Sequence, residues 1–364
     1  MSCTNEHILL ITDAFFPAIG GAETLFLQMA LDWVALGKKV TVLTSHHHGT
    51  KDDEYYKGIH IIRVGYTRRS FARQSSIKWY QLITSHLSDF PISQIHTASN
   101  TAIIGAYLLS KIFRIQRTIT IHEIYGMLWI KLWGRRGITK YLIERCGLWC
   151  LRFHEYHCVS RYTRNSLRLS TMLPDRLLHY TPNTLDTAYR SVKTLDNVIL
   201  QTLRERNNLT NHAIGLFFGS LGYIKWLVVL LDHRDEIRES LPDFRLVIIS
   251  PDTQVLYHKG KRYTSITSLV EALWIYKDQL TLLEQVPNDI LKHWIGLSDV
   301  VLLPSLAEWF GYAIAESLAM QKKLLTTGVG GIMERMHHND DVVIVNPRDH
   351  RWKALQQLLM TPVR

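Results

Sequence analysis

The sequence is poor in cysteine and has no long apolar run. It contains four cysteines in 364 residues, which is too few for a disulfide framework, and their spacing is not that of a zinc site. Apolar stretches such as residues 226–231 are far shorter than the ~18 residues needed to cross a bilayer. The first residues show no basic segment followed by an apolar core, so we expect no signal peptide. These absences favour a protein of the reducing cytoplasm.

Acidic residues are scarce in only one half of the chain. Residues 1–200 hold 24 basic and 14 acidic side chains, whereas residues 201–364 hold 18 of each, so the formal charge of +10 lies entirely in the first half. Such an excess attracts nucleic acid, phospholipid headgroups or a phosphorylated substrate; a solubility bias without a partner is the alternative. The overall composition, 46% apolar and 20% charged, is that of a soluble globular protein and excludes general disorder.

Short apolar runs alternate with helical patterns along the whole chain. In the first half we predict strands at residues 7–12, 39–44, 58–64, 118–121 and 156–160, and helices at residues 22–36, 102–113 and 161–169. In the second half we predict strands at residues 214–218, 244–249, 300–303, 324–326 and 342–345, and helices at residues 225–239 and 312–320. The alternation predicts an α/β protein with two Rossmann-like domains, each a doubly wound parallel sheet. We place these domains at residues 1–190 and 191–364, with a hydrophilic linker around residues 190–211.

Ligands of open α/β sheets bind beyond the carboxyl ends of the strands, so the residues after each predicted strand form the candidate site. Gly20 and Gly21 follow the first strand and begin a helix, where free backbone amides and the helix dipole attract phosphate. A plain strand-to-helix turn is the alternative. His122 follows the strand at residues 118–121, although a lone histidine is more often structural.

Similar residues follow the strands of the second half. Gly219 and Ser220 come after the strand at residues 214–218, where glycine permits close approach of a ligand. Lys225, near a predicted helix start, can neutralise a phosphate.

Two carboxylates lie on either side of a predicted helix start. Glu308 precedes it and Glu316 lies within the helix, with Phe310, Gly311 and Tyr312 between them. Carboxylates accept hydrogen bonds from sugar or ribose hydroxyls, while amides at a helix N-terminus bind phosphate. This segment therefore favours a ligand that carries both hydroxyl and phosphate groups.

Six motifs in one order resemble the retaining glycosyltransferases of family 4 (glycosyl transferases group 1), which have the GT-B fold. In chain order they are Gly20-Gly21-x-Glu23, His122-Glu123, Val159-Ser160, Pro182-Asn183-x-x-Asp186, the E-x7-E segment from Glu308 to Glu316, and Gly330-Gly331-Ile332-x-Glu334. The resemblance spans about residues 7 to 347.

This resemblance implies an activity and a division of labour between the domains. A hexose-type sugar would pass from a nucleotide-diphosphate sugar to a glycan or lipid-linked acceptor, with retention of configuration. The N-terminal domain would bind the acceptor and the C-terminal domain the donor, across a central cleft. The sequence has no Asp-x-Asp, which fits a metal-independent enzyme without a separate cofactor, in which protein cations and helix ends replace a divalent ion.

The resemblance also implies a role for each candidate residue. His122, Glu308 and Lys225 would be catalytic, at the reacting sugar and at the diphosphate leaving group. The expected donor-binding residues are Gly20, Gly21, Gly219, Ser220, Phe310, Gly311, Tyr312 and Glu316, of which Glu316 would bind the ribose.

Three departures from the family pattern motivate an alternative. Ser220 stands where the family usually has arginine, and Trp226 and Trp309 stand where it has glycine. The alternative is a homologue with a degraded donor site that has a non-catalytic role in binding or in a complex with a partner. A nucleotide-sugar epimerase shares the fold, but the intact E-x7-E segment argues against it.

Basic and aromatic residues are interleaved in two segments of the first half, residues 63–78 and 127–152. Tryptophan with lysine or arginine on an amphipathic stretch is typical of helices that bind anionic membranes. We therefore expect contact with the inner face of a membrane, with two core helices that have solvated basic faces as the alternative. No nucleic-acid motif accompanies the charge, so nucleic acid is not an expected partner. We interpret His46, His47 and His48 as a solvated loop and not as a metal site.

Overall fold

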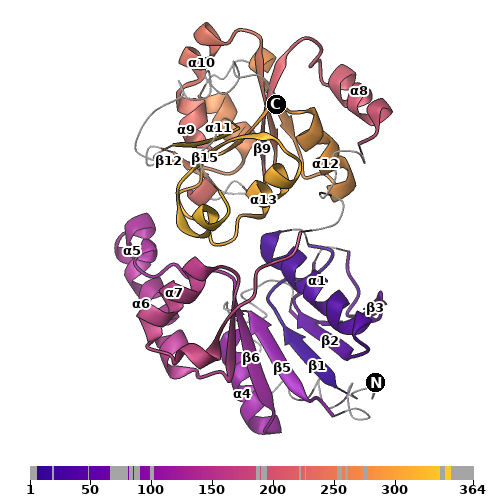
Figure 1. Cartoon of the computed structure of the whole chain (residues 1–364), viewed down its shortest axis with the longest axis vertical. Helices are drawn as coiled ribbons and strands as arrows, with labels where there is room; N and C mark the ends of the chain where they lie inside the picture. The colour runs from indigo at the N-terminus through magenta and orange to yellow at the C-terminus, as the bar shows by residue number, and fades with distance from the viewer. Residues whose placement is uncertain are drawn as a thin grey trace. The chain divides into compact units, whose positions relative to one another are not determined.

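The computed structural model describes residues 6–18, 20–47, 49–65, 81, 85, 91–98, 102–185, 189, 195–220, 223–225, 227–251, 256–258, 261–273, 277–336 and 341–345. The chain divides into two compact units, Met1–Thr184 and Leu185–Arg364, and each contains its own parallel sheet (Figure 1). The sequence boundary was expected a few residues later, at 190/191. Several residues singled out from the sequence lie outside the described part of the chain: His48, Arg68, Arg69, Arg73, Lys78, Asp186 and Trp226.

Unit 1 has eight strands in one sheet among its described residues. They are β1 (His7–Ile11), β2 (Lys39–Thr44), β3 (Asp53–Tyr56), β4 (Ile59–Arg63), β5 (Gln94–Ala98), β6 (Gln116–Ile121), β7 (Glu155–Cys158) and β8 (Leu178–Tyr180). Their order is β3-β4-β2-β1-β5-β6-β7-β8, and every pair is parallel except β3 with β4. The helices are α1 (Gly21–Ala35), α4 (Ile103–Phe113), α5 (Leu128–Trp133), α6 (Arg135–Cys150), α7 (Arg161–Thr171) and the 3-10 turn η1 (Asp175–Leu177).

The central strand β1 is buried on both faces, as a continuous apolar run predicts. Leu10 belongs to a cluster with Phe26 of α1. Leu9 belongs to a different cluster, with Ala106 and Leu109 of α4. Because successive side chains of a strand point to opposite faces, α1 and α4 cover opposite faces of the sheet (Figure 1).

Unit 2 has the same architecture. Its strands are β9 (Ala213–Phe218), β10 (Phe244–Ile249), β13 (Leu280–Leu283), β14 (Val300–Leu303), β15 (Lys323–Thr327) and β16 (Val342–Val345). They form a parallel sheet in the order β13-β10-β9-β14-β15-β16, and a separate hairpin joins β11 (Leu256–His258) and β12 (Lys261–Tyr263). The helices are α8 (Asn197–Arg206), α9 (Val228–Asp232), α10 (Arg234–Ser240), α11 (Ile266–Ala272), α12 (Asn288–Leu297), α13 (Tyr312–Ala319) and the 3-10 turns η4 (Tyr223–Lys225), η5 (Lys277–Gln279) and η6 (Gly330–Glu334). The predicted fold class of two doubly wound α/β sheets is confirmed.

Two predicted segments of unit 2 are wrong. Residues 225–239 do not form one helix, since they comprise the end of η4, then α9 and α10. The carbonyl of Ile224 accepts a 2.6 Å hydrogen bond from the amide of Leu306, so it is tied to the loop after β14. The expected linker at residues 190–211 contains α8, because the Asp196 carboxylate caps that helix by accepting from the Val198 amide at 2.8 Å.

Candidate active site

The carboxyl ends of the parallel strands share one edge of the unit 2 sheet, where the sequence predicts the donor site. Gly219 and Ser220 follow β9 directly and are exposed. The amide of Gly219 donates to the carbonyl of Ile249 at the end of β10, at 3.1 Å. Its φ of +117° belongs to the region that favours glycine. These two residues therefore lie on the predicted edge of the sheet.

Lys225 and Glu308 form an ion pair at this edge, although 83 residues separate them. The Lys225 Nζ donates to the Glu308 Oε2 at 2.6 Å, and the two side chains are only 24% and 11% exposed. The bond between Leu306 and Ile224 holds the two segments together at the backbone level. The structure thus brings together two of the three residues that the sequence singles out as catalytic.

The backbone of Glu308 is held by the glycine loop of η6. Its carbonyl accepts a 2.9 Å hydrogen bond from the amide of Gly331. A Cβ on Gly330, whose φ is +61°, would overlap the same carbonyl. Glycine at position 330 is therefore required by both conformation and space, and it fixes where Glu308 lies.

The E-x7-E segment turns into α13 at Gly311, the N-cap residue, whose φ is +74°. Phe310 is buried, and the Arg335 guanidinium lies over its ring, 3.5 Å from the centroid. The ring of Tyr312 also contacts Phe310, with centroids 4.8 Å apart. Glu316 lies one turn further along α13 and is half-buried. The predicted carboxylates and the helix N-terminus therefore belong to one local structure.

Two features of this segment were not found from the sequence. Trp309, expected to narrow or block the sugar pocket, is buried and 7% exposed. Arg335 places a cation beside Phe310, and no sequence motif singled it out. Its only signal was its position one residue after the Gly330-Gly331-Ile332-x-Glu334 motif.

In unit 1, Gly20 is the N-cap of α1 and Gly21 is its first residue. A Cβ on Gly20 would overlap the Glu23 carboxylate, which therefore lies at this helix N-terminus. A carboxylate is favoured at the positive end of the helix dipole. A phosphate bound at Gly20 and Gly21, as the sequence predicts, must therefore displace the Glu23 side chain.

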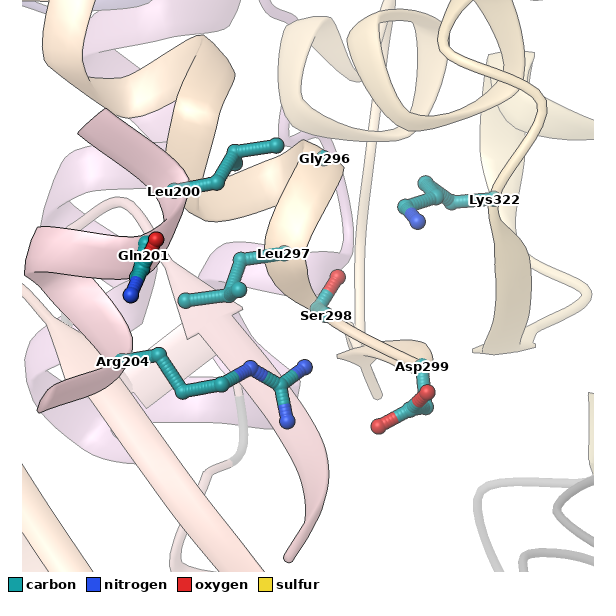
Figure 2. A pocket seen from close by; sticks show the side chains of 8 residues that line it. All are labelled: Leu200, Gln201, Arg204, Gly296, Leu297, Ser298, Asp299 and Lys322. Carbon is teal, nitrogen blue, oxygen red and sulfur yellow. The ribbon is translucent and has the colours of Figure 1, made fainter. Parts of the chain in front are cut away.

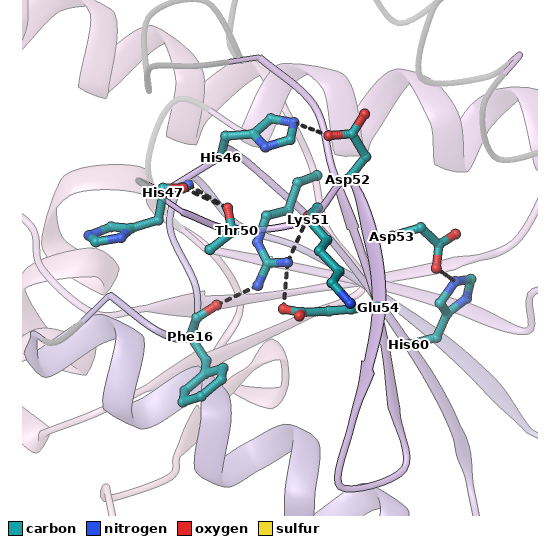
Figure 3. Close-up of polar contacts among 10 residues, drawn as sticks. Phe16, His46, His47, Thr50, Lys51, Asp52, Asp53, Glu54 and His60 are labelled. Carbon is teal, nitrogen blue, oxygen red and sulfur yellow. Dashed lines mark hydrogen bonds and ion pairs between the residues drawn. The ribbon is translucent and has the colours of Figure 1, made fainter.

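The loop that leads into α1 is held by the buried Arg63 of β4. Its guanidinium donates to the carbonyls of Phe16 at 2.7 Å and Lys51 at 3.0 Å, and it pairs with Glu54 at 2.6 Å (Figure 3). Arg63 was expected in the membrane-facing segment 63–78. That expectation is wrong for Arg63, because its side chain is buried.

His46 belongs to the neighbouring loop, where it pairs with Asp52 at 3.4 Å (Figure 3). The backbone of His47 exchanges hydrogen bonds with the Thr50 hydroxyl. Across the described residues, no group of three or more His, Cys, Asp or Glu side chains is arranged to hold a metal ion.

His122 directly follows β6 and is half-buried, so it lies at the carboxyl edge of the unit 1 sheet. The loop after it is fixed from α6. The Glu144 carboxylate accepts hydrogen bonds from the amides of Tyr125 at 3.0 Å and Gly126 at 2.7 Å. The Tyr125 hydroxyl in turn donates to Glu123 at 3.3 Å.

Unit 2 also has a cavity of about 460 Å³ on another side (Figure 2). Its lining residues are Leu200, Gln201, Arg204, Gly296, Leu297, Ser298, Asp299 and Lys322. Burial lowers the pKa of Lys322, which the Asp299 charge opposes. Asp299 precedes β14 and Lys322 precedes β15, so this cavity lies at the amino ends of the strands. It is therefore separate from the candidate active site.

Comparisons with known proteins agree with this geometry. A family described as Glycosyltransferase Family 4 matches residues 19–189, and one described as Glycosyl transferases group 1 matches residues 212–360. The GPI3 subunit of phosphatidylinositol N-acetylglucosaminyltransferase from Saccharomyces cerevisiae is 20% identical over 90% of this chain and 69% of its own length. A homologous subunit of the same transferase from Arabidopsis thaliana is 22% identical over 97% of this chain and 74% of its own length.

Two solved structures show a similar fold over almost the whole chain. Sucrose-phosphate synthase of Thermosynechococcus elongatus has a TM-score of 0.79 at 20% identity, over 98% of this chain and 90% of that chain. HepE of Anabaena, in complex with UDP-glucose, has a TM-score of 0.72 at 14% identity, over 96% of this chain and 88% of that chain.

Proposed function

Because the chain belongs to the glycosyltransferases of family 4 and group 1, with the GT-B fold, we propose that it transfers a hexose-type sugar with retention of configuration. The donor is a nucleotide-diphosphate sugar. The acceptor is a lipid-linked molecule or a glycan at a membrane surface. The phosphatidylinositol named for the yeast and Arabidopsis relatives supports the lipid class.

The observation that carries the proposal is the Lys225–Glu308 ion pair beside the start of α13. Its lysine can turn to the diphosphate when the donor binds and stabilise the charge that develops on the leaving group. Glu308 then accepts hydrogen bonds from the transferred sugar. The amides of Phe310 and Gly311 and the exposed Gly219–Ser220 turn contact the donor, with Tyr312 beside them, and Glu316 binds the ribose hydroxyls.

Unit 1 supplies the acceptor side of the proposed reaction. His122 contacts the reacting sugar from the end of β6, and Gly20 and Gly21 meet the diphosphate once Glu23 moves aside. Lys225 and helix N-termini replace a divalent ion, so neither a metal nor a separate cofactor is required. Catalysis then depends on positioning and on charge stabilisation.

Release of nucleoside diphosphate from a panel of UDP-, GDP- and ADP-sugars tests the proposal. We expect slow hydrolysis of at least one donor in EDTA, and loss of at least about 90% of that rate in Glu316→Ala, because the ribose loses its acceptor. Glu271→Ala, at an exposed position of α11, is the matched control and should keep the rate. No hydrolysis of any donor would contradict an active enzyme.

A non-catalytic binding protein is the second candidate, because Ser220 is exposed at the end of β9 and leaves that position without a cation. A missing charge-assisted hydrogen bond of roughly 1.5–3 kcal/mol to the diphosphate would weaken donor binding about 10–100-fold. Ser220→Arg separates the two candidates. Increased hydrolysis in this variant, from an undetectable wild-type rate, would favour the degraded donor site.

A further inference from the structure

Helix α6 exposes an apolar face, the reverse of the usual arrangement. A helix on the surface of a soluble protein normally turns its apolar stripe to the core. In α6 the buried residues are Gly137 and Leu148, whereas Leu142 and Trp149 are 52% and 59% exposed. At 3.6 residues per turn, Ile138, Leu142 and Trp149 fall within an arc of about 40°. They form a continuous apolar stripe on the outer face of the helix.

Basic side chains surround this stripe. Residues 127–152 contain six basic residues, Lys131, Arg135, Arg136, Lys140, Arg145 and Arg152, and a single acidic one, Glu144. The Glu144 carboxylate is directed inward. It accepts three hydrogen bonds, from the amides of Tyr125 and Gly126 and from the Trp129 Nε1 at 2.9 Å. The charge that α5 and α6 present to an approaching surface is therefore positive.

The two helices form a preformed element. A Cβ on Gly137 would overlap the carbonyl of Trp129, so glycine allows α5 and α6 to pack backbone to backbone. The Trp129 ring stacks on Tyr125 with centroids 4.2 Å apart. The Lys140 Nζ lies 4.6 Å from the centroids of both Trp129 and Trp133. A rigid element loses little conformational entropy on binding.

From these observations we propose that the α5–α6 hairpin, residues 128–150, is a docking surface for a bilayer that contains anionic lipid. Tryptophan and aliphatic side chains enter the interface, while lysine and arginine contact the headgroup phosphates. A protein partner with an acidic rim is a different occupant. The structure favours lipid, because the stripe is convex and built of aliphatic and tryptophan side chains on one helix, with positive charge on both sides.

The position of the hairpin gives this contact a purpose. Glu144 of α6 holds the backbone of Tyr125 and Gly126, three and four residues after His122. Docking would therefore bring a lipid-linked acceptor close to the loop that carries His122. Membrane contact itself does not depend on the donor chemistry, so its test is separate from that of the proposed reaction.

Flotation with vesicles tests the surface. We expect the protein to bind vesicles of phosphatidylcholine and phosphatidylglycerol, and to bind pure phosphatidylcholine at least about tenfold less, because the basic residues recognise headgroup charge. Leu142→Ser with Trp149→Ser should reduce binding at least about tenfold. The matched control is Ile104→Ser with Leu108→Ser, an exposed apolar pair of α4 in the same unit, and it should bind like the wild type.

Three results would overturn the proposal: no flotation of the wild type, equal binding to neutral vesicles, or equal losses in the two double variants. Donor hydrolysis without vesicles, measured on the same preparations, shows whether the donor site is intact. Failure of docking with intact hydrolysis would reject this surface and leave the proposed reaction standing.

A second measurement does not depend on a destabilising substitution. Cys146 lies on the exposed side of α6, while Cys158 is buried. With Cys3→Ser and Cys150→Ser, an environment-sensitive NBD fluorophore can be attached at Cys146 alone. We expect its emission to shift to the blue and rise with anionic vesicles, and ~0.5 M salt to reverse this. An unchanged spectrum while the protein floats would place the contact elsewhere and overturn the proposal.

Discussion

Gly330→Ala should damage donor turnover by displacing Glu308. Alanine at the positive φ of Gly330 costs about 1–2 kcal/mol of folding free energy. Its Cβ also overlaps the Glu308 carbonyl, so that backbone must move by a distance on the order of 1 Å, and a misplacement of that size costs about 100-fold in rate. We therefore expect donor hydrolysis to fall about 100-fold in a protein that still folds.

Gly37→Ala is the matched control for this change. Gly37 has a φ of +79°, and a Cβ there would meet no atom within 4 Å, so it shares the conformational cost of Gly330→Ala without the collision. Both variants should lose similar stability in urea unfolding, and only Gly330→Ala should lose turnover. Equal turnover in the two variants would refute the idea that the η6 loop positions Glu308.

Three further predictions concern charge and hydrogen bonding. Lys225→Met should weaken nucleoside diphosphate binding about 10–100-fold in a calorimetric titration, because a charge-assisted hydrogen bond is worth roughly 1.5–3 kcal/mol; unchanged affinity would move the diphosphate elsewhere. Burial, and then the neighbouring His157, lower the pKa of His96 to about 3. The unfolded chain therefore binds this proton first, and the unfolding free energy should fall as the pH drops below about 6.5, by at most ~1.4 kcal/mol per pH unit for this group; equal urea midpoints at pH 7 and pH 5 would contradict it. Glu144→Ala should lower the unfolding free energy by about 3 kcal/mol, since three hydrogen bonds are lost, whereas the exposed Asp32→Ala should change it by less than about 0.5 kcal/mol.

The sequence predicted the elements whose local pattern agrees with their final environment. The strand at residues 7–12 is apolar throughout and became β1, which is buried on both faces. The E-x7-E segment was recognised because its chemistry lies within one stretch of chain. Pairing of Glu308 with Lys225 followed only from the family resemblance, since their contact depends on two distant loops.

The missed elements owe their stability to tertiary contacts. Strand β5 carries His96 and Thr97 in a buried position, which does not resemble an apolar strand. The ring nitrogens of His96 bond to the hydroxyls of Thr118 and Thr120, at 2.7 and 2.8 Å, so its polarity is satisfied across the sheet. Arg63 is similarly paired with Glu54 of β3, a strand that the sequence did not predict. Single-sequence patterns carry no information about such partners.

Calorimetric titration of the purified protein with UDP, GDP and ADP in EDTA tests the central claim most directly. The account predicts that at least one of them binds in the micromolar range without a divalent ion, because Lys225 and the α13 N-terminus meet its phosphates, and that Glu316→Ala weakens this binding at least about tenfold. Absence of heat with all three nucleotides, or binding that appears only when a divalent ion is added, would contradict it.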